Sequence, residues 1–256
     1  MVEKHAVVLI SFTAREKVSD KIIDTTDEAT AKKAGMYTAK QAYGPQAVVV
    51  GNKEVLPGVD EALLAMKEKE SRTVDVPPSK GFGERNPELV RVLPLQEFKA
   101  RNLVPVPGMV VDANGYYGRV QSVSGGRVRV DFNPELAGKE LLYELTLEKM
   151  ISFPQEKLEA FKNKFFEKAK AAISLANGKA TIALDVNGAM PHPEAKFAFT
   201  RAVLSFIPEV KSVQFTEEFT KAFFDRKPKA AHGEPGHEHA DGEADEASEE
   251  SEDTEE

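Results

Sequence analysis

The chain reads VVVGNKEVLPGVDEALLAMKEKESRTVDVPPSKGFG from Val48 to Gly83, and this stretch decides the fold. A short β run ends at Gly51, and the Pro57-Gly58 turn precedes a short amphipathic helix expected from Val59 to Met66. After a polar turn, a strand is expected from Arg72 to Val76. Two prolines close it, because proline cannot donate to a sheet ladder. This order of elements favours an α+β unit in which one helix packs on an antiparallel sheet.

Flanking segments extend this pattern on both sides. Val7 to Thr13 reads as a strand, Ser19 to Thr26 as a turn followed by a hydrophobic-Asp-Thr segment, and Leu136 to Leu147 as a final strand. With the central stretch, these segments resemble the FKBP-type peptidyl-prolyl cis/trans isomerases of the SlyD type, from Met1 to Ile151 with one insertion. The resemblance implies an FKBP-like sheet packed on a short helix, divided into residues 1–83 and 134–151.

The resemblance also implies the position of an isomerase pocket. The residues that match the family's pocket are Phe12, Ile23, Asp24, Val48, Val55, Leu56, Val59, Phe82 and Tyr143. Asp24 is the one charged side chain among them, and in the family this carboxylate points into the pocket. Two positions depart from the common pattern, because the floor residue, often Trp, is Val59 and a frequent Tyr is Phe82. The missing hydroxyl removes a hydrogen bond worth about 0.5–1.5 kcal/mol.

The chemistry implied by the resemblance needs a pocket and no reactive group. Prolyl isomerisation rotates a C–N bond whose barrier is about 18–20 kcal/mol because resonance keeps it planar. The twisted amide has less charge separation than the planar one, so an apolar site that excludes water favours the transition state. We therefore expect no cofactor and no catalytic metal.

An insertion is expected over residues 84–133, where SlyD-type proteins carry their insert-in-flap domain. Its short β runs are predicted at Glu88–Leu93, Met109–Ala113, Tyr116–Val123 and Arg127–Phe132, with a small helix at Leu95–Arg101. Apolar side chains are too many here to be fully buried, so a partly exposed face that binds unfolded chains is expected. The residues predicted to bind substrates are Leu93, Phe98, Val104, Met109, Tyr116 and Tyr117. The alternative is that their exposure is incidental.

A helix–strand–helix–strand unit is predicted after Ile151, over residues 152–226. A long helix is expected from Pro154 to Asn177, then a strand from Ala180 to Val186, a helix from Pro193 to Phe206 and a strand from Val210 to Phe215. The unit resembles the extra C-terminal domain of long archaeal FKBPs. Its apolar content leaves a homodimer through this domain open.

Composition narrows the function classes. The 256 residues carry a formal charge of −8, but residues 232–256 hold twelve Asp or Glu and no Lys or Arg, so the rest is +4 (34 basic against 30 acidic residues). Clusters of Lys and Arg with interleaved aromatics are missing, so nucleic-acid partners are not expected. The absence of cysteine excludes disulfides and thiol catalysis and favours a cytosolic location. Apolar runs are too short to cross a membrane.

Residues 227–256 are almost free of apolar side chains, so a disordered acidic tail is predicted. The leading interpretation is a cytoplasmic isomerase that assists folding, with unfolded, proline-containing polypeptides as partners and chaperone activity from the insertion. One alternative is a holdase in which Val59 and Phe82 have weakened or removed the isomerase. The other is a metal-delivery protein that uses the tail residues His232, His237 and His239, although metal-binding tails of SlyD proteins are far richer in His and Cys.

Overall fold

The structure is a computed structural model that describes all residues except 1, 40, 114, 167–168, 186–190 and 220–256. Residues 1–218 form one compact unit, and nearly all of the second unit, residues 219–256, lies outside the described residues. The predicted acidic tail and its histidines therefore also lie outside them. Within the described residues, no helix is both long and apolar enough to cross a membrane.

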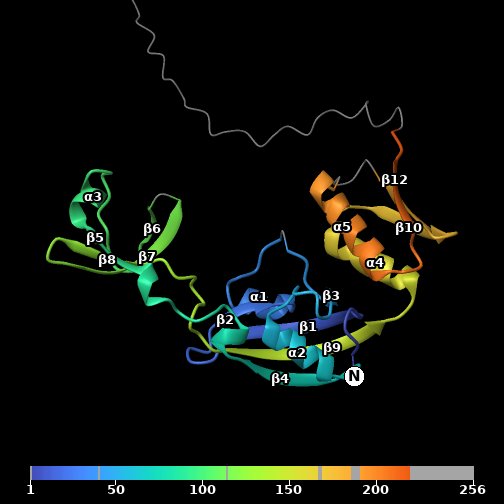
Figure 1. The fold of residues 1–256 in the computed structure, drawn as a ribbon, viewed down its shortest axis with the longest axis horizontal. Helices are drawn as coiled ribbons and strands as arrows, with labels where there is room; N and C mark the ends of the chain where they lie inside the picture. The colour runs from blue at the N-terminus through green and yellow to red at the C-terminus, as the bar shows by residue number, and fades with distance from the viewer. Residues whose placement is uncertain (1, 40, 114, 167–168, 186–190, 220–256) are drawn as a thin grey trace, which may run out of the picture. The chain divides into compact units, whose positions relative to one another are not determined.

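The N-terminal sheet has five antiparallel strands. Its order is β2–β1–β9–β4, and β3 also pairs with β1. The strands are β1 (Val7–Glu16), β2 (Ile22–Thr25), β3 (Gln46–Val49), β4 (Ser71–Val76) and β9 (Leu141–Ile151). At the centre of the sheet, β1 pairs with β9 from Val7 opposite Ile151 to Glu16 opposite Leu141. Because β1 and β9, the first and last strands of this sheet, pair with each other, the insertion leaves the sheet after β4 and returns to it at β9 (Figure 1).

Two helices belong to this sheet. Helix α1 (Glu28–Lys33) begins at Asp27, whose carboxylate accepts a hydrogen bond from the Thr30 N–H. Helix α2 (Pro57–Ala65) begins two residues before the predicted start, because proline is well suited to the first helical turn. Its Gly58 lies so close to β4 that a Cβ there would be 3.1 Å from the Val76 side chain. Glycine therefore allows the tight packing of α2 on the sheet.

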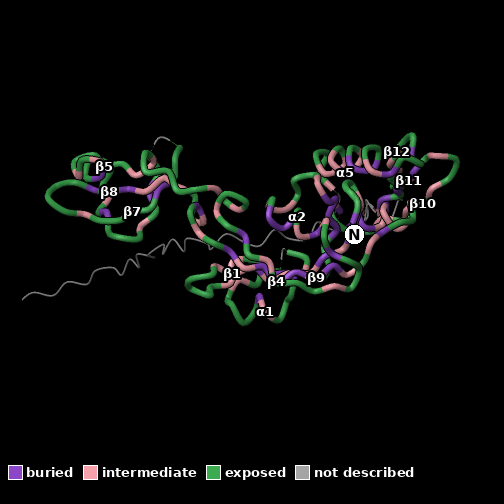
Figure 2. The backbone as a smooth tube through the Cα atoms, turned by 60° about the horizontal axis from the view of Figure 1, so that its bottom comes forward, coloured by how far each residue is buried: buried purple, intermediate pink, exposed green. Residues whose placement is uncertain are grey.

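The insertion forms its own four-stranded antiparallel sheet in the order β5–β8–β7–β6. Its elements are η1 (Pro78–Lys80) and η2 (Pro87–Leu89) on the approach, then β5 (Val90–Pro94), α3 (Leu95–Lys99), β6 (Val110–Ala113), β7 (Tyr116–Ser124) and β8 (Arg127–Asp131). The predicted strands and helix are found here with ends shifted by at most two residues. The buried core is small, with Phe98 and Val128 among its five members. Most of this backbone is exposed (Figure 2).

The C-terminal part corrects one prediction. Its elements are α4 (Pro154–Phe165), β10 (Ala171–Ala176), β11 (Lys179–Leu184), α5 (Pro193–Phe206) and β12 (Ser212–Glu217). The expected helix from Pro154 to Asn177 is wrong, because it ends at Phe165 and a strand follows. Asn177-Gly178 has positive φ at both residues and turns β10 into β11 as a hairpin. The same dipeptide also ends helices, so the sequence permitted both interpretations.

The C-terminal elements pack against the N-terminal sheet. Successive side chains of a strand point to opposite faces. Val8 and Ile10 accordingly join the core that contains Val59 and Leu63 of α2, whereas Val7 joins the core that contains Phe161 of α4. The sheet is thus covered on both faces around Val7 to Ile10, by α2 on one face and by α4 on the other. β11 and β12 pair in parallel, and α5 contacts β12 (Figure 1).

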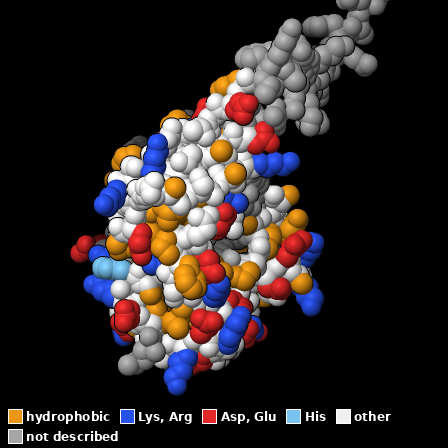
Figure 3. Space-filling view, turned by 90° about the vertical axis from the view of Figure 1, so that its right-hand side faces the viewer, with side chains coloured by type: hydrophobic (Ala, Val, Ile, Leu, Met, Phe, Trp, Pro, Cys, Tyr) orange, Lys and Arg blue, Asp and Glu red, His pale blue; other side chains and the backbone are white. Residues whose placement is uncertain are grey.

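The surface of the C-terminal part is mixed. Exposed apolar side chains include Phe153, Phe197 and Leu204. On the face shown in Figure 3, hydrophobic patches lie among Lys, Arg, Asp and Glu side chains. The homodimer expected through this domain stays a prediction.

Candidate functional site

One large cavity brings together most of the predicted pocket residues. Its volume is about 1290 Å³. Those of the nine predicted residues that line it are Phe12, Asp24, Val48, Val55, Leu56, Val59 and Tyr143. They come from β1, β2, β3, β9, the start of α2 and the loop before it. Segments far apart in the sequence thus supply a single set of walls.

The apolar end of the cavity is built on paired strands and on α2. Phe12 of β1 and Tyr143 of β9 lie on neighbouring strands, with ring centroids 5.7 Å apart and planes tilted by 39°. Val59 lies in the first turn of α2 and is buried. Side chains in a packed core keep fixed rotamers, so these walls form a shaped apolar surface before any ligand arrives.

The loop from Gly51 to Leu56 forms the rim. The Gly51 N–H donates to Asp60 Oδ1 at 2.9 Å, and Glu54 accepts from the Val49 N–H at 3.0 Å, so the start and the middle of the loop are anchored. The Leu56 carbonyl accepts from the N–H groups of Val59 and Asp60 as α2 begins. Within the described residues, the N–H groups of Val55 and Leu56 donate no hydrogen bond. They are therefore available to a bound peptide carbonyl.

Asp24 is the acidic group of this end. The chain just after β2 is well fixed, because the Thr26 N–H donates to the Phe12 carbonyl and the Phe12 N–H donates to Thr26 Oγ1, both at 2.9 Å. Burial of the carboxyl group raises the pKa of Asp24, against the opposing effect of a 2.8 Å hydrogen bond from the Thr25 N–H. Asp24 is nevertheless exposed, so its carboxyl group also keeps contact with solvent.

The pKa of Tyr143 is also shifted by burial in this part of the cavity. Burial, with a smaller contribution from the charge of Asp24, raises the pKa of Tyr143 to about 12. The phenol therefore keeps its proton at neutral pH and can donate a hydrogen bond into the cavity. The apolar end thus offers hydrophobic walls, one carboxylate, one phenol and free backbone donors.

Two predicted pocket residues do not line the cavity. Ile23 packs half-buried against the N-terminal core. Phe82 is 43% exposed. It follows the turn η1, where the Gly83 N–H donates to the Pro78 carbonyl, and it starts the path into the insertion. Phe82 does not line the cavity in this structure, so its expected role in closing the pocket stays a prediction.

Sequence analysis missed a second wall of the cavity. Helix α4 contributes Gln155, Glu156, Glu159, Ala160, Asn163 and Lys164, and the segment 41–48 adds a further side. The apolar period of α4 identifies the face that packs on the sheet. No sequence signal indicates that its polar face borders a cavity, because that depends on how the helix docks.

The insertion has a separate cavity of about 440 Å³. Of the six residues predicted to bind substrates, Leu93, Phe98 and Tyr116 line it. Val104 and Tyr117 are 81% and 71% exposed outside it. Met109 packs against the small core of the insertion instead. An apolar surface is thus present, and only part of it is concave.

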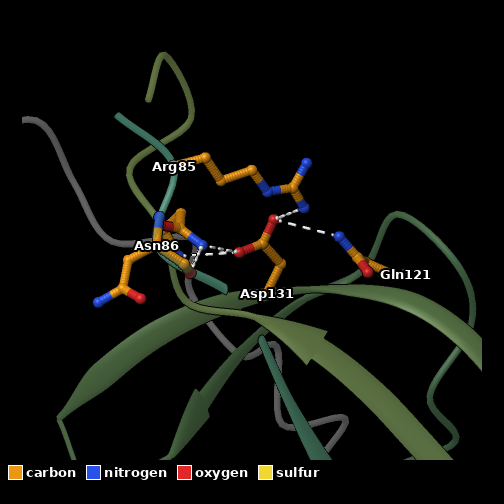
Figure 4. Close-up of polar contacts among 5 residues, drawn as sticks. Arg85, Asn86, Gln121 and Asp131 are labelled. Carbon is orange, nitrogen blue, oxygen red and sulfur yellow. Dashed lines mark hydrogen bonds and ion pairs between the residues drawn. The ribbon is translucent and has the colours of Figure 1, made fainter. Parts of the chain in front are cut away.

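The junction of the insertion is held by a polar cluster (Figure 4). Asn133 Nδ2 donates to the Asn86 carbonyl at 2.9 Å, and the Asn86 N–H donates back to Asn133 Oδ1 at 2.8 Å. Asp131 accepts from Arg85, from Gln121 at 3.2 Å and from Asn133 at 2.7 Å. Burial opposes the charged form of Asp131, but these donors and the Arg85 charge outweigh it and lower its pKa. The cluster therefore joins the segment that enters the insertion, at Arg85 and Asn86, to the segment that leaves it, at Asp131 and Asn133.

Among the described residues, no group of three His, Asp or Glu side chains is arranged to hold a metal ion. The metal-delivery alternative rests on tail histidines that lie outside these residues.

Comparisons with known proteins identify the family of this chain. A family profile for FKBP-type peptidyl-prolyl cis-trans isomerases matches residues 2–97, and a profile for the IF domain of FKBP26 matches residues 91–136. The second match falls on the sheet of the insertion.

Three relatives are similar over about half of the chain. The chain is 37% identical over 129 residues to a short-type peptidyl-prolyl cis-trans isomerase of Methanocaldococcus jannaschii, covering 50% of this chain and 82% of the relative. It is 28% identical to a probable FKBP-type 16 kDa peptidyl-prolyl cis-trans isomerase of Pseudomonas fluorescens, a match that covers 56% of this chain and 88% of the relative. It is 29% identical to the FKBP-type peptidyl-prolyl cis-trans isomerase SlyD of Treponema pallidum, a match that covers 57% of this chain and 76% of the relative. The chain therefore belongs to the FKBP-type peptidyl-prolyl cis/trans isomerase family.

Proposed function

We propose that this isomerase accelerates the folding of proline-containing chains in the cytosol and that the apolar end of the large cavity is its catalytic pocket. The observation that carries the proposal is the convergence of Phe12, Asp24, Val59 and Tyr143 on one cavity. The absence of cysteine fits a reducing compartment.

The pocket residues suit a rotation about the prolyl bond. The proline ring packs between Phe12, Tyr143 and the floor at Val59, where water is excluded. Free N–H groups of Val55 and Leu56 bind a carbonyl of the flanking backbone and keep that part of the substrate still while the other part turns. Loss of amide resonance reduces the charge separation, which an apolar site favours. Asp24 acts on an amide dipole that changes during the rotation, so its charge affects ground and transition states differently.

The second part of the proposal concerns the insertion, residues 84–133. Its cavity and the exposed side chains of Val104, Tyr116 and Tyr117 provide an apolar surface that suits unfolded chains. A client held there keeps its prolines at a high local concentration near the pocket of the discontinuous unit 1–83 plus 134–151. Residues 152–226 correspond in this proposal to the C-terminal domain of long archaeal FKBPs.

A protease-coupled assay with a short X-Pro peptide tests the catalytic pocket. Phe12→Ala removes a wall residue and should lower kcat/KM about tenfold or more while the circular dichroism spectrum stays unchanged. Phe153→Ala is the matched control, since Phe153 is 69% exposed and does not line the cavity. If the full-length protein does not accelerate the peptide at all, the holdase alternative replaces the proposal. If both variants keep full activity, the pocket lies elsewhere.

A further inference from the structure

The large cavity is bigger than one prolyl bond requires. Small-molecule sites typically occupy about 300–1,000 Å³, and this cavity reaches about 1290 Å³. Its apolar end lies at Phe12 and Tyr143. It continues past Leu9 and Ala47 to the polar face of α4, which presents Gln155, Glu159 and Asn163 at helical spacing.

This second wall is fixed to the sheet. Leu158 and Phe161 of α4 are buried in one core with Val49 and Ile151 of the sheet, and α4 contacts β3 (Figure 1). At the end of the helix, Lys164 Nζ donates to the Ala47 carbonyl at 3.0 Å and to Glu54 at 2.5 Å. Since Glu54 also anchors the rim loop, α4 and the rim are held as one frame around the cavity.

The polar groups of this wall differ in whether they are already used. Gln155 Nε2 donates to the Ile173 carbonyl at 3.3 Å. Within the described residues, the Asn163 side chain makes no hydrogen bond. An amide that both donates and accepts suits the backbone of an extended peptide. A polypeptide, which has both N–H donors and carbonyl acceptors, therefore suits the Asn163 side chain better than a purely apolar molecule does.

The charged side chains that line the cavity nearly cancel, with four acidic ones (Asp24, Glu54, Glu156 and Glu159) and three basic ones (Lys53, Lys149 and Lys164). Lys164 is paired with Glu54, and Lys149 is paired with Glu156 at 2.8 Å. In the part of the chain that the structure describes, Glu159 has one ion-pair partner, Lys162 at 3.7 Å, and its side chain is 44% exposed. A basic side chain that enters the cavity can therefore pair with Glu159 without breaking a short ion pair.

We infer that the polar face of α4, defined here by Gln155, Glu159 and Asn163, is a subsite for the polypeptide segment next to the isomerised proline, and that Glu159 selects a Lys or Arg side chain in that segment. The C-terminal part thereby takes a direct part in substrate specificity. This inference rests on the proposed function of the apolar pocket, whose occupant must continue toward α4.

The test compares peptides with the full-length protein. Exchange NMR measures isomerisation in peptides that extend well beyond a single Leu-Pro bond on both sides and carry one Lys, or one Glu, at each flanking position in turn. A short peptide without charged side chains reports on the apolar pocket alone. We expect Lys to be preferred over Glu by about two- to fivefold in kcat/KM at one position, the size of an exposed ion pair.

Glu159→Gln should abolish this preference, mainly through KM, and leave the short peptide unchanged. Glu194→Gln is the matched control, because Glu194 is exposed in the first turn of α5 and does not line the cavity. The inference is overturned if the wild type shows no preference at any position, or if Glu159→Gln slows the short and long peptides equally. A short peptide that is not accelerated by the wild type would instead refute the proposed function, so the two failures are distinguishable.

Discussion

The N-terminal sheet and the insertion are both antiparallel sheets, yet they bury their side chains very differently. The sheet packs α2 on one face and the C-terminal elements on the other, and the pocket residue Val59 is buried in the core beneath α2. The insertion has a single small core and leaves Val104 and Tyr116 81% and 73% exposed. Catalysis needs walls that do not move, whereas capture of varied clients tolerates an open apolar surface. The two regions thus suit the two parts of the proposed function.

Replacing residues 84–133 by a short Gly-containing flap separates the two regions most strongly. The ends are close enough for such a flap, because the Gly138 N–H donates to the Gly83 carbonyl at 2.8 Å. Catalysis of the proline-limited refolding of a protein client should fall by about 10- to 100-fold, as the effective concentration of the client is lost. Peptide kcat/KM should change less than about twofold.

The matched control for this deletion keeps the insertion and changes only its surface. Tyr116→Ser with Tyr117→Ser should reproduce part of the refolding defect, because both side chains are exposed and contribute little to the fold. An equal loss towards peptide and protein clients in the deletion variant would mean that the insertion merely supports the pocket.

Asp24→Ala tests the catalytic side of the comparison. We expect peptide kcat/KM to fall about tenfold, or about 1.4 kcal/mol, because a charge beside the amide is lost. The melting temperature should stay within about 2 °C, since the raised pKa indicates that burial of the charged form does not stabilise the fold. Asp20→Ala, a carboxylate of the preceding turn that is 76% exposed, serves as control and should keep full activity. Parallel loss of activity and stability would make Asp24 a structural residue.

Asp131→Asn tests the junction between the two regions. The pKa of Asp131 is lowered in the folded protein, so its carboxylate stabilises the fold above its unfolded pKa and this contribution is lost as the pH falls through the lower folded value. The variant should therefore be less stable than the wild type by about 1–2 kcal/mol at pH 7 and by little at a pH below the folded pKa. Calorimetric melting at both pH values measures the difference. A pH-independent loss would show that the geometry of the cluster matters and its charge does not.

Many of the helices and strands could be predicted from the sequence, and each wrong or missing prediction has a physical cause. Strands β1, β3 and β4 and helix α2 follow from alternation and turn chemistry, which are local, as does the sheet of the insertion. The hairpin at Asn177-Gly178 was read as a helix stop because the same dipeptide serves both purposes. The wall formed by Glu159 and Asn163 depends on the docking of α4, which no local pattern encodes.

Phe82 gives the smallest expected effect and the sharpest contrast between motif and structure. By the family motif, Phe82→Tyr restores a hydroxyl to the pocket and should raise activity by about two- to tenfold, the worth of one hydrogen bond. In the structure, the side chain is 43% exposed and does not line the cavity, so the new hydroxyl would point to water. We therefore expect kcat/KM for a short peptide to change less than about 1.5-fold. A clear gain would mean that the segment 81–83 closes over bound substrate and that the pocket is completed only in the complex.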